Sequence, residues 1–249
     1  MIRRVAKIGV FKMRKINLLI AASVPLFLIT TSVSNAQFGL PSIPGLNSLP
    51  IPGLGGGSGG GGGFSMAAES LGNNLRTALY NQVMAISLVQ EAQGDKTKAG
   101  RLRATANAIQ AMKQPNKDTM EKALKAVEEN PVNRESVARI KDASGQKKIA
   151  EASAHMDVVV VYNGLAVLSA GAMIVFRPSM SDLANAPGIL DAAQLAITAI
   201  PSQTSNFKKY NEILEAYMAQ NNIAQATSAQ KVAIAKKTDP EAAKKAKDF

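Results

Sequence analysis

The sequence predicts an all-α protein, an irregular bundle of about six or seven helices with a buried central helix near 146–176, preceded by a disordered Pro/Gly-rich arm. Three observations favour this class. Apolar residues recur every three or four positions through most of 64–223. Ala, Leu, Lys, Gln and Met, all strong helix formers, dominate the same stretch. Aromatic residues make up only 4% of the chain and cysteine is absent, so the core must be built from aliphatic side chains without disulfides.

Residues 1–36 have the pattern of a secretory signal peptide. Six basic residues and no acid occupy the first fifteen positions, and an apolar run from Leu18 to Ile29 follows. Ser34 and Ala36 provide small residues at the two recognised positions of a cleavage site, so we expect cleavage near Ala36 and a periplasmic or secreted protein. A retained N-terminal anchor is the alternative. Met13 is a second candidate start, and it would give the signal a more usual length.

The segment 37–63 is predicted to be a flexible arm. It contains the tetrapeptide Ile-Pro-Gly-Leu twice, at 43–46 and 51–54, and then eight glycines and one serine at 55–63. Proline and glycine both oppose regular structure, and the stretch carries no charge. It is either a plain linker or an arm whose repeated apolar peptide, within 37–54, docks on a partner or on the protein itself.

Four helices are expected in the first half of the helical domain, which we place at 64–223. The first, about 66–93, has one apolar face and is broken at Gly94, and the second, about 97–113, ends before Pro115. The third is predicted to open at an Asp118–Glu121 capping box and to stop before Pro131. Asn133 is expected to cap a fourth helix, about 134–143, and Gly145 to mark a break or kink.

The stretch from Val158 to Phe176 contains nineteen residues without a formal charge. A buried central helix of a soluble bundle explains this best, because such a helix is apolar on all sides. A membrane-inserting helix over 158–176 is long enough. A β-hairpin is the third alternative, since Val158–Tyr162 is rich in β-branched residues and Asn163-Gly164 is a favoured hairpin turn.

Two further helices are expected after Pro178. One runs from Pro187 to about Ile200, and the other is amphipathic and covers about 203–221, ending at Asn221-Asn222. Residues 224–249 are small, polar and rich in lysine, so we expect a basic tail that is frayed or disordered.

The net charge does not indicate a nucleic-acid partner. The formal charge is +11, but the six basic residues of 1–36 account for more than half of it, and 231–249 contribute another +3. The remaining charges of both signs are mixed, and there is no Trp to interleave with them. We therefore expect no nucleic-acid binding.

No pattern of residues indicates catalysis, a metal or a cofactor. His155 is the only histidine, and Glu151 precedes it by one helical turn, a pair that could orient a metal ion or a proton transfer but is more often a solvated helical pair. The carboxylates Glu128, Glu129, Asp182 and Asp191 are scattered, as expected for helix-start or surface residues. Phosphate-binding and nucleophile-elbow motifs are absent. We predict no catalytic, metal-binding or cofactor-binding residue.

Together these features predict an exported, non-enzymatic helical protein, a structural or accessory interaction component of a bacterial cell-envelope or secretion assembly. A protein partner is expected, through the arm 37–54 or the helical surface. The alternative is a membrane-active or lipid-binding helical protein that inserts 158–176.

Overall fold

The computed structural model describes residues 63–112, 115–175, 204 and 206–248. The predicted signal peptide 1–36, nearly all of the arm 37–63 and the predicted helix 187–200 lie outside these residues. The described part is all-helical, as the sequence predicts, and contains no strand.

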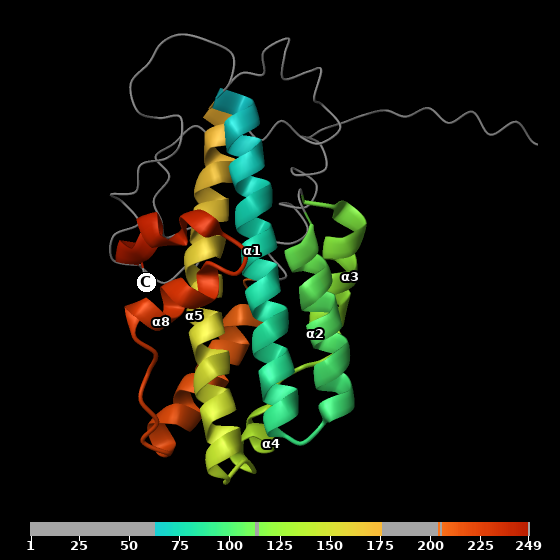
Figure 1. Cartoon of the computed structure of the whole chain (residues 1–249), viewed down its shortest axis with the longest axis vertical. Helices are drawn as coiled ribbons and strands as arrows, with labels where there is room; N and C mark the ends of the chain where they lie inside the picture. Colours follow the sequence, from blue (N-terminus) through green and yellow to red (C-terminus); the bar gives the residue numbers. More distant parts are fainter. Residues whose placement is uncertain (1–62, 113–114, 176–203, 205, 249) are drawn as a thin grey trace, which may run out of the picture. The chain divides into compact units, whose positions relative to one another are not determined.

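Two long helices, α1 (Gly63–Ala92) and α5 (Ala143–Val175), lie side by side and antiparallel (Figure 1). At 1.5 Å per residue they are about 45 and 50 Å long. α2 (Lys96–Ala111) and α3 (Lys117–Glu128) pack against α1 on the side away from α5. The short α4 (Arg134–Ala138) then leads into α5.

The chain then forms a helix over 206–220, α8 (Ser228–Ala235) and the 3₁₀ helix η3 (Pro240–Asp248). α8 packs on α5, and η3 packs on α8. A hydrogen bond joins the helix over 206–220 to the residues just before α5. The hydroxyl of Tyr217 donates to the carbonyl of Ile140 at 2.7 Å.

Periodicity predicted the core positions of three helices correctly. In α1 and α2, and in the helix over 206–220, the expected apolar faces are buried. The buried positions are Leu71, Leu75, Leu79, Val83, Ile86, Val89, Leu102, Ala106, Ile109, Phe207, Tyr210, Ile213, Leu214, Tyr217 and Met218. Helix α1 buries most of its residues because it packs against α5, α2 and α3. It is therefore less amphipathic than a surface helix.

Three helix ends confirm the sequence interpretation. Gly94 adopts φ +85°, and the amide of Asp95 donates to the carbonyl of Gln90 at 2.9 Å, which closes α1 with a Schellman turn. Asn133 caps α4, because its side chain accepts from the amide of Ser136 at 2.8 Å. The helix over 206–220 also ends as expected, with Asn222 in the left-handed region at φ +53°.

Two local predictions were wrong. The N-cap of α3 is Asn116, whose side chain accepts from the amide of Thr119 at 3.0 Å, so Asp118 lies inside the first turn. Gly145 does not break or kink a helix, because it lies in the first turn of α5. A Cβ there would lie 2.5 Å from Cγ2 of Ile140, so glycine provides space at this position.

Helix α5 resolves one alternative for 143–175. The whole segment is helical, so the β-hairpin interpretation is wrong there. The segment forms a helix in spite of its β-branched residues because it packs along α1. The side chains of this helix that are buried in the core include Ile149, Ala152, Met156, Val159 and Ala166.

The C-terminal residues differ from the predicted frayed or disordered tail. Residues 227–248, called the C-terminal segment below, form α8 and η3, and bury Ala235 and Ala242 against Ala78, Val158, Val161 and Tyr162. The composition of this segment did not indicate that it folds, because small residues such as alanine can pack closely without forming an obvious apolar face. Thr227 and Gln230 form a capping box, which was the local signal for α8.

Candidate functional site

Polar side chains lie inside the contact between α1 and α5. Asn74 Nδ2 donates to Ser169 Oγ at 3.2 Å, and Ser169 Oγ donates to the carbonyl of Leu165 at 2.9 Å. Asn81 Oδ1 lies 2.7 Å from His155 Nδ1. We call these four side chains, Asn74, Asn81, His155 and Ser169, the polar seam. It joins the two helices in one register, because sliding either helix would break both contacts.

The hydrogen bonds of Asn81 define which ring nitrogen of His155 carries the proton. Asn81 Nδ2 already donates to the carbonyl of Thr77 at 2.8 Å, so Asn81 Oδ1 faces the ring as an acceptor. Nδ1 of His155 therefore carries the proton and donates. Burial lowers the pKa of His155 to about 3, with a smaller contribution from the positive charge of Lys237, so the ring is neutral at physiological pH.

The predicted pairing of His155 with Glu151 is not formed. His155 is fully buried and faces α1, whereas Glu151 is exposed. The ring tilts against Tyr80, with centroids 6.5 Å apart, and Nε2 has no hydrogen-bond partner among the described residues. His155 thus has the surroundings of a structural core residue.

Two more buried amides lie on the same pair of helices. Gln82 is completely buried and Asn163 is 2% exposed. Neither side chain finds a hydrogen-bond partner among the described residues. Burying an unpaired amide costs free energy, so these two residues weaken the contact that the polar seam organises.

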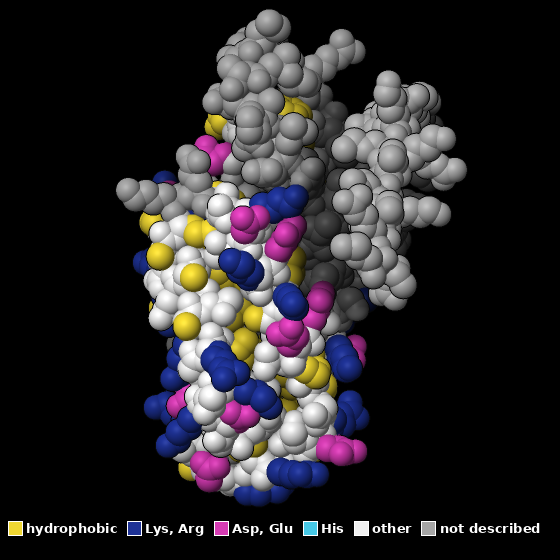
Figure 2. Space-filling view, turned by 90° about the vertical axis from the view of Figure 1, so that its right-hand side faces the viewer, with side chains coloured by type: hydrophobic (Ala, Val, Ile, Leu, Met, Phe, Trp, Pro, Cys, Tyr) yellow, Lys and Arg dark blue, Asp and Glu magenta, His cyan; other side chains and the backbone are white. Residues whose placement is uncertain are grey.

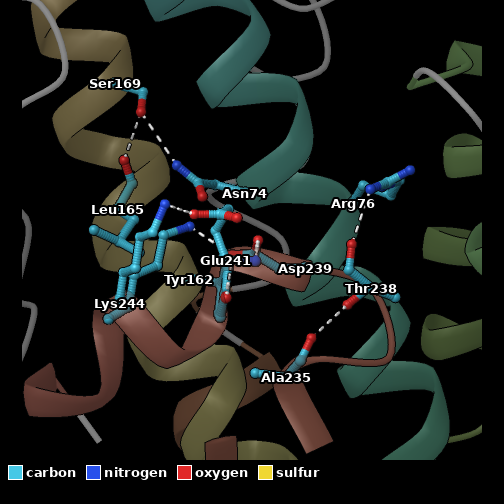
Figure 3. A network of polar contacts seen from close by, with 11 residues as sticks. Asn74, Arg76, Tyr162, Leu165, Ser169, Ala235, Thr238, Asp239, Glu241 and Lys244 are labelled. Carbon is cyan, nitrogen blue, oxygen red and sulfur yellow. Dashed lines mark hydrogen bonds and ion pairs between the residues drawn. The ribbon is translucent and has the colours of Figure 1, made fainter.

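The C-terminal segment adds a second polar network beside the seam (Figure 3). The Tyr162 hydroxyl donates to Asp239 Oδ2 at 2.5 Å, and Lys245 Nζ donates to the same oxygen at 2.6 Å. Lys245 Nζ also lies 4.9 Å from the centroid of the Tyr162 ring. Arg76 of α1 donates to the carbonyl of Thr238 at 2.9 Å. Helices α1 and α5 therefore both hold this segment.

The charges in this network perturb one another. Burial alone would raise the pKa of Asp239, but the hydrogen bonds from Lys245 and Tyr162 hold that pKa below its ordinary value. The pKa of Tyr162 is strongly raised, by burial and then by the negative charge of Asp239. Asp239 is therefore a carboxylate and Tyr162 a neutral donor at physiological pH.

Two further contacts attach the segment to the body. Lys231 forms an ion pair with Asp157 of α5 at 3.0 Å, and Gln110 of α2 donates to the carbonyl of Lys237 at 3.0 Å. The C-terminal segment thus contacts α1, α2 and α5. Sequence analysis missed this site because its partners are 74 to 162 positions apart in the chain.

Of the other carboxylates singled out from the sequence, the two that the structure describes do not assemble into a site. Glu128 and Glu129 are exposed on α3, and Glu129 lies 3.7 Å from Lys125. Asp182 and Asp191 lie outside the described residues. Within the part of the chain that the structure describes, no group of three or more His, Cys, Asp or Glu side chains could hold a metal ion.

No family model matches this chain, and neither a curated protein nor a solved structure is significantly similar to it.

Proposed function

We propose that this protein is an exported, non-enzymatic helical protein that acts as a structural or accessory interaction component of a bacterial cell-envelope or secretion assembly. The signal-peptide pattern of 1–36 supports export, and the repeated apolar peptide of the arm supports a protein partner. In this proposal the helical body is the stable scaffold that carries the arm.

The observation that carries the proposal is the packing of α5 inside the protein. This helix is the most apolar long element described, yet it packs along α1 through the polar seam, which gives it a partner inside the protein. A buried helix held in register by buried polar contacts is what a rigid scaffold needs. We therefore take α5 as the central helix of a soluble bundle.

The state of His155 supports a non-enzymatic role. A general base must reach substrate and have a pKa near the working pH. His155 is buried, donates to Asn81 and has its pKa lowered to about 3. The one side chain best suited to acid–base catalysis is thus assigned to packing.

The export part of the proposal is tested by expressing the full chain in a bacterial host and sequencing the N-terminus of the product. We expect a periplasmic or secreted protein that begins at Gln37. A cytoplasmic product that keeps residues 1–36 would refute export.

The partner is tested by affinity capture from the native envelope followed by mass spectrometry. A variant with serine at Ile43, Leu46, Ile51 and Leu54 keeps the length of the arm and removes its apolar side chains. Loss of a reproducible partner from this variant assigns binding to the arm, whereas retention assigns it to the helical surface. A monomer that captures nothing reproducibly would contradict the proposal.

A second candidate function is membrane insertion of 158–176. It is favoured by one observation: Ala143–Met173 is long and apolar enough to cross a membrane by length and composition. More than half of its most apolar stretch is buried inside the protein, however, and its His155 and Asn163 would be costly in lipid. Extraction of membranes at alkaline pH distinguishes the two, because an inserted protein stays in the pellet and a scaffold is released.

A further inference from the structure

One end of the helical domain carries most of its uncompensated positive charge. The C-terminal end of α1, the start of α2, α4 and the start of α5 meet there (Figure 1). Gln93 donates to Ser136 of α4 at 2.8 Å. Glu91 pairs with Arg103 of α2 and with Lys148 of α5, the latter at 3.3 Å. These contacts place residues 91–103 and 134–151 on a common surface.

Six cations on this surface are exposed and make no side-chain hydrogen bond or ion pair with the described residues. They are Lys96, Arg101, Arg134, Arg139, Lys141 and Lys147, and we call them the basic end. Figure 2 shows many Lys and Arg side chains over the lower part of the molecule, with fewer Asp and Glu side chains among them.

The acidic residues of this surface are largely used within the protein. Glu91 is shared by Arg103 and Lys148, and Asp95 lies 3.1 Å from Lys98 while it caps α2. Asp142 accepts from the amide of Gly145 at 2.7 Å. Asp142, Glu135 and Glu151 are exposed and form no ion pair with a described residue, so the six unpaired cations outnumber the unpaired acids.

We propose that the basic end binds the anionic headgroups of a phospholipid bilayer. Its exposed cations come from α2, from α4 and the link that follows it, and from the start of α5, and such a spread fits a surface of mobile headgroups. Residues 91–103 and 134–151 contain no Phe, Tyr or Trp, so they offer bases nothing on which to stack. A bilayer fits better than a nucleic acid for this reason.

This contact would orient the protein. Helix α1 ends and α5 begins at this surface, and the other end of α1, at Gly63, is about 45 Å away along its axis. The arm joins the helical domain at Gly63. Binding through the basic end would therefore place Gly63, the first described residue of α1, on the side remote from the bilayer. The inference goes beyond the proposed function, and its test needs neither export nor a protein partner.

The test uses residues 37–249, which retain every described residue, and vesicles of phosphatidylcholine with or without about 30% phosphatidylglycerol, enough to give the surface a negative potential. We expect binding only to the anionic vesicles, weakened by salt. The triple variant Lys96→Gln/Arg101→Gln/Lys141→Gln should bind about 100-fold more weakly, since each basic residue near an anionic surface contributes about fivefold.

The control Lys122→Gln/Lys208→Gln/Lys236→Gln removes the same charge at exposed positions on α3, the 206–220 helix and the end of α8. It should bind within about threefold of the unmodified protein, because screening limits the reach of each charge to about 8 Å. Thermal melting and circular dichroism check that both variants fold.

Three results would overturn the proposal. They are vesicle binding that does not depend on the phosphatidylglycerol content, an equal loss of vesicle affinity in the two triple variants, and no binding to anionic vesicles at low salt. Binding of a single-stranded oligonucleotide that depends on the basic end, with no vesicle binding, would assign the surface to nucleic acid instead.

Discussion

Asn81 on α1 accepts a hydrogen bond from His155 on α5 across 2.7 Å, between residues 74 positions apart in the chain. Both side chains are completely buried. The contact joins the two longest helices of the described region, and Asn74 and Ser169 form a second polar contact between them. The behaviour of this pair provides the first two predictions.

Stability should fall in mild acid because of His155. The pKa of His155 is lowered to about 3 in the fold, against about 6.5 in an unfolded chain. Between these values the unfolded chain binds a proton that the folded protein does not, so the free energy of unfolding decreases as pH falls, with a slope of up to about 1.4 kcal/mol per pH unit. Its contribution is fully present above about pH 6.5.

Urea unfolding of the unmodified protein and of His155→Gln, measured from pH 4.5 to 7.5, isolates this effect. Glutamine keeps a donor for Asn81 and does not titrate. The difference in unfolding free energy between the two proteins should shrink as pH falls. Parallel curves for the two proteins would show that His155 titrates normally.

Replacing two adjacent amide side chains of α1 by leucine should change the stability of the protein in opposite directions. Asn81 is bonded to His155 and Thr77, whereas Gln82 is equally buried without a partner among the described residues. Asn81→Leu should destabilise the protein by about 2–3 kcal/mol, because it leaves the ring proton of His155 unpaired. Gln82→Leu should stabilise it by about 1 kcal/mol, because an uncompensated amide is removed. Chemical denaturation measures both, and a destabilised Gln82→Leu protein would indicate a partner for that amide.

Asp239 should hold the C-terminal segment in place. Asp239→Asn weakens the acceptor of both Tyr162 and Lys245, with an expected loss of about 1–3 kcal/mol. Because the pKa of Asp239 is lowered in the fold, its contribution is present above about pH 4 and is lost as pH falls further. Hydrogen exchange should show faster exchange confined mainly to 228–248.

The matched control for Asp239→Asn is Glu241→Gln, which removes one negative charge two residues further on, in η3. Glu241 pairs with Lys244 at the exposed surface, and such pairs contribute little. Exchange in 228–248 should stay close to that of the unmodified protein. Equal acceleration in both variants would mean that net charge, not the bond to Tyr162, holds the segment.

Two glycines should differ sharply in their tolerance of alanine. A Cβ at Gly72 of α1 would lie 2.7 Å from Cγ of Pro115, whose ring cannot yield easily, so Gly72→Ala should cost about 1–3 kcal/mol. A Cβ at Gly100, exposed in α2, would meet nothing within 4 Å. Gly100→Ala should therefore stabilise the protein by about 0.5–1 kcal/mol. Thermal melting of the two variants compares them, and similar melting temperatures would contradict the close approach of Pro115.

The local sequence was sufficient where a helix has one apolar face or a clear end. Leu71, Leu79 and Ile86 are buried as their spacing predicts, and Gly94 closes α1 through a positive φ that glycine adopts freely. These features depend on residues within a few positions of one another, so one sequence contains all the information that they need.

Local reasoning was insufficient where two nearby signals compete or where the partner is distant. Asn116 takes the N-cap that Asp118 was expected to fill, and the glycine at 145 makes room for Ile140 instead of breaking a helix. The C-terminal segment is folded because Tyr162 and Arg76, far from it in sequence, hold Asp239 and Thr238. Nothing in the composition of 224–249 indicates those bonds.

The sequence by itself determined that the described chain is helical, where most of its helices begin and end, and which of their faces are apolar, because spacing and capping act over a few residues. Only the tertiary structure decided which helix each face meets. It paired His155 with Asn81 instead of Glu151, left Gln82 without a hydrogen-bond partner among the described residues, and folded the C-terminal segment onto α1 and α5. Those outcomes depend on the register of two long helices, and that register is fixed by contacts across the whole chain.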